Sequence, residues 1–216
     1  MIVVVGNPIA RAPDTGGGLA GIPAGAAAAA ARAGATVQLV GKAGEDRAGD
    51  DLMLALARAG VGHAALLRDP AHATPIVAAV DQDAETGDAP TNAPPVTPAD
   101  PAERPSLDAA DVELALRYLP EYTTVVVAEP QPDAVVAIVV DAAAFAGAAL
   151  LLVVDGAAGG SVPPASAVVF EAPGPDPDGA FATMLGELAA AIDRGTPVAA
   201  AFREVEGRLG LTPAGE

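Results

Sequence analysis

The chain has 216 residues, enough for one domain with a full hydrophobic core. Its hydrophobic fraction of 51% excludes a disordered chain, and an aromatic fraction of only 3% predicts a core of Ala, Val, Leu and Ile. The net charge of −17 argues against binding to nucleic acid or to an anionic membrane surface, because both would repel so acidic a protein.

Cysteine is absent from the sequence, which excludes a disulfide framework, a thiolate metal site and a cysteine nucleophile. This absence fits a reducing compartment, so we expect a cytoplasmic protein. The first residues, MIVVVGNPIA, carry no positive charge before their apolar run and predict a first strand rather than a signal peptide. No uninterrupted apolar stretch reaches about 18 residues, the length of a membrane-spanning helix, and we therefore predict a soluble protein without a membrane partner.

Strand and helix patterns alternate in the N-terminal part of the chain. β-branched runs predict two strands, while an Ala-rich stretch and a stretch with leucines at helical spacing predict two helices. Pro23 suits the first position of the earlier helix, and Gly34 and Gly60 end the two helices. In chain order we expect these elements at residues 2–5, 23–33, 36–40 and 46–59.

The middle of the chain has a different pattern. Short strands are expected at 64–67 and 74–80, and an acidic, polar turn follows them. We interpret residues 62–88 as a small β flap, or lid, that lies outside the main sheet. Exposed strand edges are usually covered or paired, so we expect this flap to join two copies of the chain in a homodimer.

The C-terminal half returns to alternating strands and helices. Ser106 or Asp108 is expected to cap a helix that runs to Leu119. Alternation at both ends of the chain predicts a parallel sheet with helices on both faces, an α/β fold in a single domain over residues 1–216. The remaining elements are expected as strands at 123–128, 150–155 and 167–170 and as helices at 132–148, 178–193 and 197–209.

A glycine-rich stretch separates the first strand from the first helix. Gly16, Gly18 and Gly21 have the spacing of a dinucleotide-binding loop, but the strand does not run directly into them and no acidic residue ends the second strand. A flexible turn and a substrate-binding loop are the other interpretations. The two histidines, His63 and His72, stand apart from any carboxylate cluster, which predicts surface or edge-strand residues and no metal site.

Asp178 opens the predicted helix at 178–193. A carboxylate at a helix N-terminus is usually a cap, and here it would accept the N–H of Ala180 or Phe181. The functional interpretation is a general base held beside free backbone N–H groups. Those groups, with the helix dipole, would stabilise a transferred phosphoryl group or another anion.

Five segments together resemble the ribokinase-like family of sugar and nucleoside kinases, the PfkB group. They are the opening strand and turn, the glycine-rich loop with its helix and strand, a "G-x-x-G-x-D-x-x-G" turn, a Thr-led lid strand, and a final turn with two closing helices. In this sequence they fall at residues 3–7, 21–40, 40–62, 74–83 and 178–210. The stretch 41–62 is the most specific part of the resemblance.

The resemblance implies a three-layer ribokinase-like sheet with a small β lid. It implies ATP and Mg²⁺ as cofactors of an active member, with transfer of the γ-phosphoryl group to a sugar or nucleoside hydroxyl. Asp178 would be the base, and the N–H groups of Gly179 and Ala180 would form the anion hole. The implied substrate-binding positions are Asp14, Gly21 and Gly25.

Several motifs depart from the family pattern. Gly25 stands where the family has an Asn on the sugar, and Arg11 stands at or near the position of the sugar-binding Asp. The turn at 176–179 does not read Gly-Ala-Gly-Asp, and the Thr/Gly-rich ATP loop that should precede it is not found. We therefore interpret the chain as a truncated, degenerate relative with weak or no sugar phosphorylation, a pseudokinase. An active small kinase and a non-catalytic binding or scaffold module are the alternatives.

Overall fold

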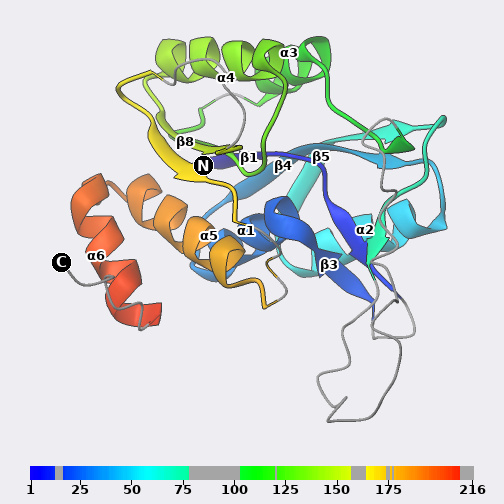
Figure 1. Cartoon of the computed structure of the whole chain (residues 1–216), viewed down its shortest axis with the longest axis horizontal. Helices are drawn as coiled ribbons and strands as arrows, with labels where there is room; N and C mark the ends of the chain where they lie inside the picture. Colours follow the sequence, from blue (N-terminus) through cyan, green and yellow to red (C-terminus); the bar gives the residue numbers. More distant parts are fainter. Residues whose placement is uncertain are drawn as a thin grey trace.

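The computed structural model describes residues 1–12, 17–77, 103–119, 121–156, 164–173, 176 and 178–209. These residues form two sheets and a set of helices (Figure 1). The strands are β1 (Ile2–Val5), β2 (Ile9–Arg11), β3 (Gly18–Ala20), β4 (Val37–Gly44), β5 (Val61–Asp69), β6 (Ile76–Val77), β7 (Thr124–Val127), β8 (Ala149–Val154) and β9 (Val168–Glu171). The helices are α1 (Gly21–Arg32), α2 (Arg47–Arg58), α3 (Ala109–Tyr118), α4 (Asp133–Ala146), α5 (Ala180–Asp193) and α6 (Val198–Leu209).

The large sheet is parallel throughout and has the strand order β5-β4-β1-β7-β8-β9. Every residue of its central strands β1 and β7 is buried. Parallel strands are covered on both faces, which explains why these two segments are continuous β-branched runs rather than alternating patterns. The parallel sheet expected from the alternation of strands and helices is confirmed.

Helices cover both faces of the large sheet. Side chains of β1 alternate between two cores: Ile2 and Val4 pack with α1, α2, α5 and α6, whereas Val3 and Val5 pack with α3 and α4. Figure 1 shows α3 and α4 above the sheet and α1, α5 and α6 below it. The three-layer α/β fold is therefore confirmed. None of the helices in the described part of the chain is long and apolar enough to cross a membrane.

Helices α1 and α5 approach each other closely because their contact is built from small residues. A Cβ atom on Gly25 of α1 would lie 2.8 Å from the Cβ of Ala182. A Cβ atom on Gly186 of α5 would lie 2.3 Å from the carbonyl oxygen of Ala26. The Ala-rich stretch of the sequence therefore serves close packing of one helix on another.

The predicted helix start at Asp46 is confirmed, and of the two candidate caps Ser106 and Asp108 the structure has Asp108. Asp46 is the N-cap of α2 and accepts the N–H of Gly49 at 2.8 Å. Asp108 is the N-cap of α3, and its side chain accepts the N–H of Asp111 at 2.8 Å in a capping box. Both aspartates satisfy backbone donors that have no partner within their helix.

The small sheet has the strand order β3-β2-β6 and lies beside the start of α1 (Figure 1). The expectation that the whole range 62–88 lies outside the main sheet is wrong for its first part, because β5 pairs with β4 as an edge strand of the large sheet. β6 does lie in the separate small sheet. The remainder of the predicted flap, from residue 78 onward, is outside the described residues, as is most of the glycine-rich loop at 14–18.

Candidate functional site

The carboxyl ends of β1 and β7 mark the point where the order of the large sheet reverses. From β1 the chain builds outward through β4 and β5 on one side, and it later builds outward from β7 through β8 and β9 on the other. In open α/β sheets, ligands bind in the crevice outside the strand ends at such a switch point. Asn7 follows β1 and Glu129 follows β7, so both lie at this edge.

A network of hydrogen bonds joins the strand ends at the switch point. The backbone N–H of Asn7 donates to Oε1 of Glu129 at 2.6 Å, and Nε2 of Gln131 donates to the same oxygen at 3.0 Å. Oδ1 of Asn7 accepts the backbone N–H of Lys42 on β4 at 3.0 Å. The ends of β1, β4 and β7 therefore share one polar cluster of carboxylate and amide groups, which suits recognition of hydroxyl groups.

Glu129 has an altered acidity in this cluster. Burial raises the pKa of its carboxyl group above the ordinary value, against the opposing effects of the Asn7 hydrogen bond and the positive charge of Arg104. Lys42, the single lysine of the chain, pairs through Nζ with Oδ2 of Asp111 at 2.6 Å. This ion pair ties β4 to the first turn of α3.

The turn before α2 is held by Asp46. Its carboxylate accepts the N–H of Thr74 at 2.8 Å and the Thr74 hydroxyl at 2.8 Å, besides the capping bond from Gly49. Burial opposes ionisation of Asp46, but these hydrogen bonds and the charge of Arg68 outweigh it and hold its pKa below the ordinary value. The turn thereby fixes the segment that enters β6 against the start of α2.

Helices α1 and α5 start at the same end of the molecule. Gly25 faces Ala182 near their N-termini, and the Arg194 guanidinium donates to the carbonyl of Ala33 near their C-termini at 3.3 Å. The two helices are therefore parallel. Their N-termini lie at one end, where N–H groups without helical partners can bind an anion.

Asp176 caps α5. Its Oδ1 accepts the N–H of Phe181 at 3.1 Å, and its Oδ2 accepts the N–H of Ala182 at 3.0 Å. The expectation that Asp178 caps this helix is wrong: Asp178 is exposed in the preceding turn, and α5 begins at Ala180 rather than at residue 178. Gly179 takes a left-handed conformation (φ 66°), and this turn brings the earlier aspartate back over the helix end.

The N–H groups predicted to form an anion hole belong to Gly179 and Ala180. The N–H of Gly179 donates to the backbone carbonyl of Asp176 at 3.2 Å. Together with the two bonds to its carboxylate, Asp176 thus engages three of the N–H donors at the start of α5. The site that the resemblance assigns to phosphate therefore already holds a negative charge from the chain itself.

The remaining predicted site residues lie as follows. Gly21 is the first residue of α1 and has a positive φ of 76°. A Cβ atom at this position would lie 3.1 Å from Cδ1 of Ile9. Gly25 lies in the contact between α1 and α5, and Asp14 is outside the described residues. Gly21, Gly25, Asp178, Gly179 and Ala180 are thus brought together by the starts of the two parallel helices.

Sequence reasoning missed the polar residues at the switch point and the role of Asp176. A signal for Glu129 was present, because an acidic residue stands two positions after a buried β-branched run and strand ends carry binding sites.

His72 pairs with Asp69, with 2.9 Å between Nδ1 and Oδ2. Among the described residues no three His, Asp or Glu side chains are grouped as metal ligands.

Comparisons with known proteins agree with this architecture. The family model described as "pfkB family carbohydrate kinase" matches residues 3–161, about three quarters of the chain. A search of curated proteins found no match. Among solved structures, ribokinase from Arabidopsis thaliana with ribose and ATP has 17% identity and a TM-score of 0.63, over 97% of this chain and 91% of that one.

Two further solved structures show the same likeness. Aminoimidazole riboside kinase from Salmonella enterica has 13% identity and a TM-score of 0.65, over 100% of this chain and 94% of that chain. An uncharacterized sugar kinase from Pyrococcus horikoshii in complex with ATP has 16% identity and a TM-score of 0.53, over 72% of this chain and 53% of that chain. At these identities the likeness establishes a ribokinase-like fold.

Proposed function

Because the chain belongs to the pfkB family of carbohydrate kinases, we propose that it binds a sugar or nucleoside at the switch point of its large sheet and transfers phosphate weakly or not at all. The protein is then a degenerate member of the family, a pseudokinase that acts as a binding module. A cytoplasmic location, expected from the lack of cysteine, is part of this proposal.

The polar cluster at the switch point supports sugar binding. Glu129, Gln131 and Asn7 offer carboxylate and amide groups at one place, held by their mutual hydrogen bonds. Hydroxyl groups of a sugar both donate and accept hydrogen bonds, and such groups complement side chains of this kind. Because burial raises the pKa of Glu129, a sugar hydroxyl that donates to its carboxylate would gain a strong acceptor in a partly desolvated place.

The observation that supports weak or no phosphotransfer is the cap on α5. The Asp176 carboxylate accepts the N–H groups of Phe181 and Ala182, beside the N–H groups of Gly179 and Ala180 that the resemblance assigns to the anion hole. A phosphate arriving there meets a carboxylate of the same sign and loses donors that would otherwise stabilise it. The described residues at the helix start therefore do not fit ATP, and we derive no catalytic step through it.

An active kinase is the second candidate function, and one observation favours it. Asp178 is exposed beside the start of α5 and takes no part in the cap. An exposed carboxylate at this place is the kind of group that can accept a proton from a substrate hydroxyl. In this case ATP and Mg²⁺ would be the cofactors, and the Asp176 cap would have to open during the reaction.

We also propose a homodimer through the small sheet. In the order β3-β2-β6, each of the outer strands has one edge without a partner strand among the described residues. Such edges are usually covered in natural proteins, and a second copy of the chain is the simplest cover. Light scattering should give a dimer mass at micromolar concentration. A monomer mass that persists at high concentration would reject the dimer.

A thermal-shift panel tests the proposed function. Ribose, fructose and adenosine are each added with and without ATP–Mg²⁺, because a ligand that binds only the folded state raises the midpoint of unfolding. We expect at least one sugar or nucleoside to raise the midpoint, with no further rise from ATP. The matched variants are Glu129→Gln, which should abolish this shift, and Glu113→Gln on the exposed face of α3, which should preserve it.

Two results of this panel would contradict the proposal. The first is a shift with ATP–Mg²⁺ alone, together with a phosphorylated product in the same sample. The second is a sugar-dependent shift of equal size in wild type and in Glu129→Gln, which would place the sugar away from the switch point.

A further inference from the structure

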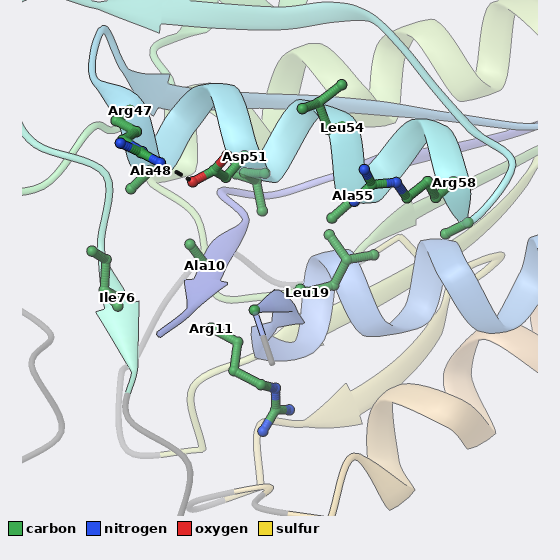
Figure 2. A pocket seen from close by; sticks show the side chains of 14 residues that line it. Ala10, Arg11, Leu19, Arg47, Ala48, Asp51, Leu54, Ala55, Arg58 and Ile76 are labelled. Carbon is green, nitrogen blue, oxygen red and sulfur yellow. Dashed lines mark ion pairs between the residues drawn. The ribbon is translucent and has the colours of Figure 1, made fainter. Parts of the chain in front are cut away.

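A cavity of about 730 Å³ lies between helix α2 and the small sheet. Ala10, Leu19 and Ile76 line it from the small sheet, and Leu54, Ala55 and Arg58 line it from α2 (Figure 2). Its volume falls within the range of natural ligand pockets, about 300–1,000 Å³. Nothing in the proposed sugar site uses these side chains.

The apolar part of the cavity lies on the face of the small sheet that is turned away from the start of α1, and Arg11, Gly17 and Gly18 line the cavity as well. Ala10 is the register partner of both Leu19 and Ile76, so the three side chains share one face. Ile9, the neighbour of Ala10, points to the opposite face and lies against Gly21 at the start of α1. The small sheet thus stands between the start of α1 and this cavity.

The wall of the cavity is largely apolar, and it also carries three arginines, Arg11, Arg47 and Arg58, and one carboxylate, Asp51. Leu54 is 53% exposed although it belongs to a helix that buries Leu52 and Leu56 in the core. An exposed leucine that faces a concave surface together with Leu19 and Ala55 offers apolar area to a ligand. This area is the part of the cavity that would be removed from water on binding.

The guanidinium of Arg58 offers a positive charge that can bind an anionic ligand. Its guanidinium lies beside Ala55 and across from Leu19 (Figure 2). Among the described residues no carboxylate pairs with it, whereas Arg47 at the other end of α2 has Asp51 at 3.9 Å. Arg58 is exposed, and Arg11 of β2, which also lines the cavity, likewise has no carboxylate partner among the described residues. A guanidinium binds a carboxylate, sulfonate or phosphate through two parallel hydrogen bonds.

We propose that this cavity is a second ligand site, which binds a small organic anion with an apolar body. The anionic group pairs with Arg58, and the apolar body lies against Leu19, Leu54 and Ala55. Such a ligand gains from both features of the cavity at once. A neutral apolar molecule would leave the guanidinium unpaired, and a small inorganic anion would leave the apolar wall in contact with water.

The test compares two fluorescent probes with nearly the same aromatic body. 8-Anilinonaphthalene-1-sulfonate carries a negative charge, and N-phenyl-1-naphthylamine carries none. In a titration of the native protein at low salt, we expect the sulfonate to bind at one site and at least about tenfold more tightly than the neutral probe, the size of a charge-assisted hydrogen bond. Added salt should weaken the sulfonate only.

Variants locate the site. Arg58→Gln should weaken the sulfonate about tenfold and leave the neutral probe unchanged, whereas Arg203→Gln on the exposed surface of α6 should change neither. Ala55→Phe fills the cavity and should weaken both probes. Unchanged unfolding midpoints of the arginine variants show that they are folded. The proposal is overturned if the two probes bind equally, if Arg58→Gln has no effect, or if native protein binds neither probe because the chain itself or a second copy covers the cavity.

Discussion

Asp46 and Thr74 are joined by two hydrogen bonds of 2.8 Å, one from the backbone N–H of Thr74 and one from its hydroxyl. Asp46 stands before α2, and Thr74 stands before β6 of the small sheet. This pair therefore connects the segment that enters β6 of the small sheet to the start of α2. Thr74 is one of only two polar residues that are buried among the described residues.

Removal of the Thr74 hydroxyl should destabilise the fold. Thr74→Val keeps the shape of the side chain but leaves Asp46 with one donor fewer in a partly buried place. We expect a loss of roughly 1.5 to 3 kcal/mol in the free energy of unfolding, the range for a hydrogen bond to a charged group. Urea unfolding measures this loss. The exposed Thr36→Val serves as control and should change stability by less than about 0.5 kcal/mol; equal effects of the two changes would contradict the role of the hydroxyl.

The same turn predicts a pH dependence of stability. The folded protein holds the pKa of Asp46 below its ordinary value, so ionised Asp46 contributes stability above that ordinary value. This contribution is lost as the pH falls through the lower folded pKa. Unfolding free energies measured between pH 7 and pH 2 should fall less steeply at the acid end in Asp46→Asn than in wild type. Parallel acid limbs in the two proteins would show that Asp46 is not protonated differently in the folded state.

Two aspartates before α5 are predicted to differ in their effect on stability. Asp176→Ala removes a cap with two hydrogen bonds and should cost about 1 kcal/mol, whereas Asp178→Ala should stay within about 0.5 kcal/mol because its side chain is exposed. Thermal unfolding of both variants beside wild type gives the comparison. A larger loss of stability in Asp178→Ala than in Asp176→Ala would contradict this assignment and would indicate that Asp178 caps α5.

Glycines of α5 and α6 should respond in opposite directions to alanine. In Gly186→Ala the new Cβ would meet the carbonyl oxygen of Ala26 at 2.3 Å, so α1 and α5 must separate, at a cost of roughly 1 to 3 kcal/mol. In Gly207→Ala no atom lies within 4 Å of the new Cβ, and the better helix propensity should stabilise by up to about 1 kcal/mol. Melting temperatures of the two variants test the close contact between α1 and α5. A higher melting temperature in Gly186→Ala than in wild type would contradict that contact.

Much of the fold could be predicted because its cause is local. Composition and spacing alone predict strands from the β-branched runs at β1 and β7 and a helix from the alanines of α1. The partner of β5 could not be predicted in this way. A strand in a lid and an edge strand of a parallel sheet share the same short apolar pattern, and only the return of the chain through α2 places β5 beside β4.

The candidate site was harder to predict because its contacts are distant in sequence. Asn7 and Glu129 meet only when β1 and β7 pair, and no spacing in the sequence announces that pairing. Asp176 and Asp178 are two carboxylates in one turn, and the left-handed conformation of Gly179 decides which of them reaches α5. Composition gives no means to choose between the two.

The central claim is that the Asp176 carboxylate, which accepts the N–H groups of Phe181 and Ala182, puts a negative charge at the start of α5 and thereby disfavours the phosphates of ATP there. Isothermal titration calorimetry of the wild-type protein with ATP and Mg²⁺ tests this claim most directly. We predict no saturable binding at micromolar ATP, with any affinity in the millimolar range or weaker. A dissociation constant in the micromolar range would contradict the account, because ATP would then bind despite the occupied helix start.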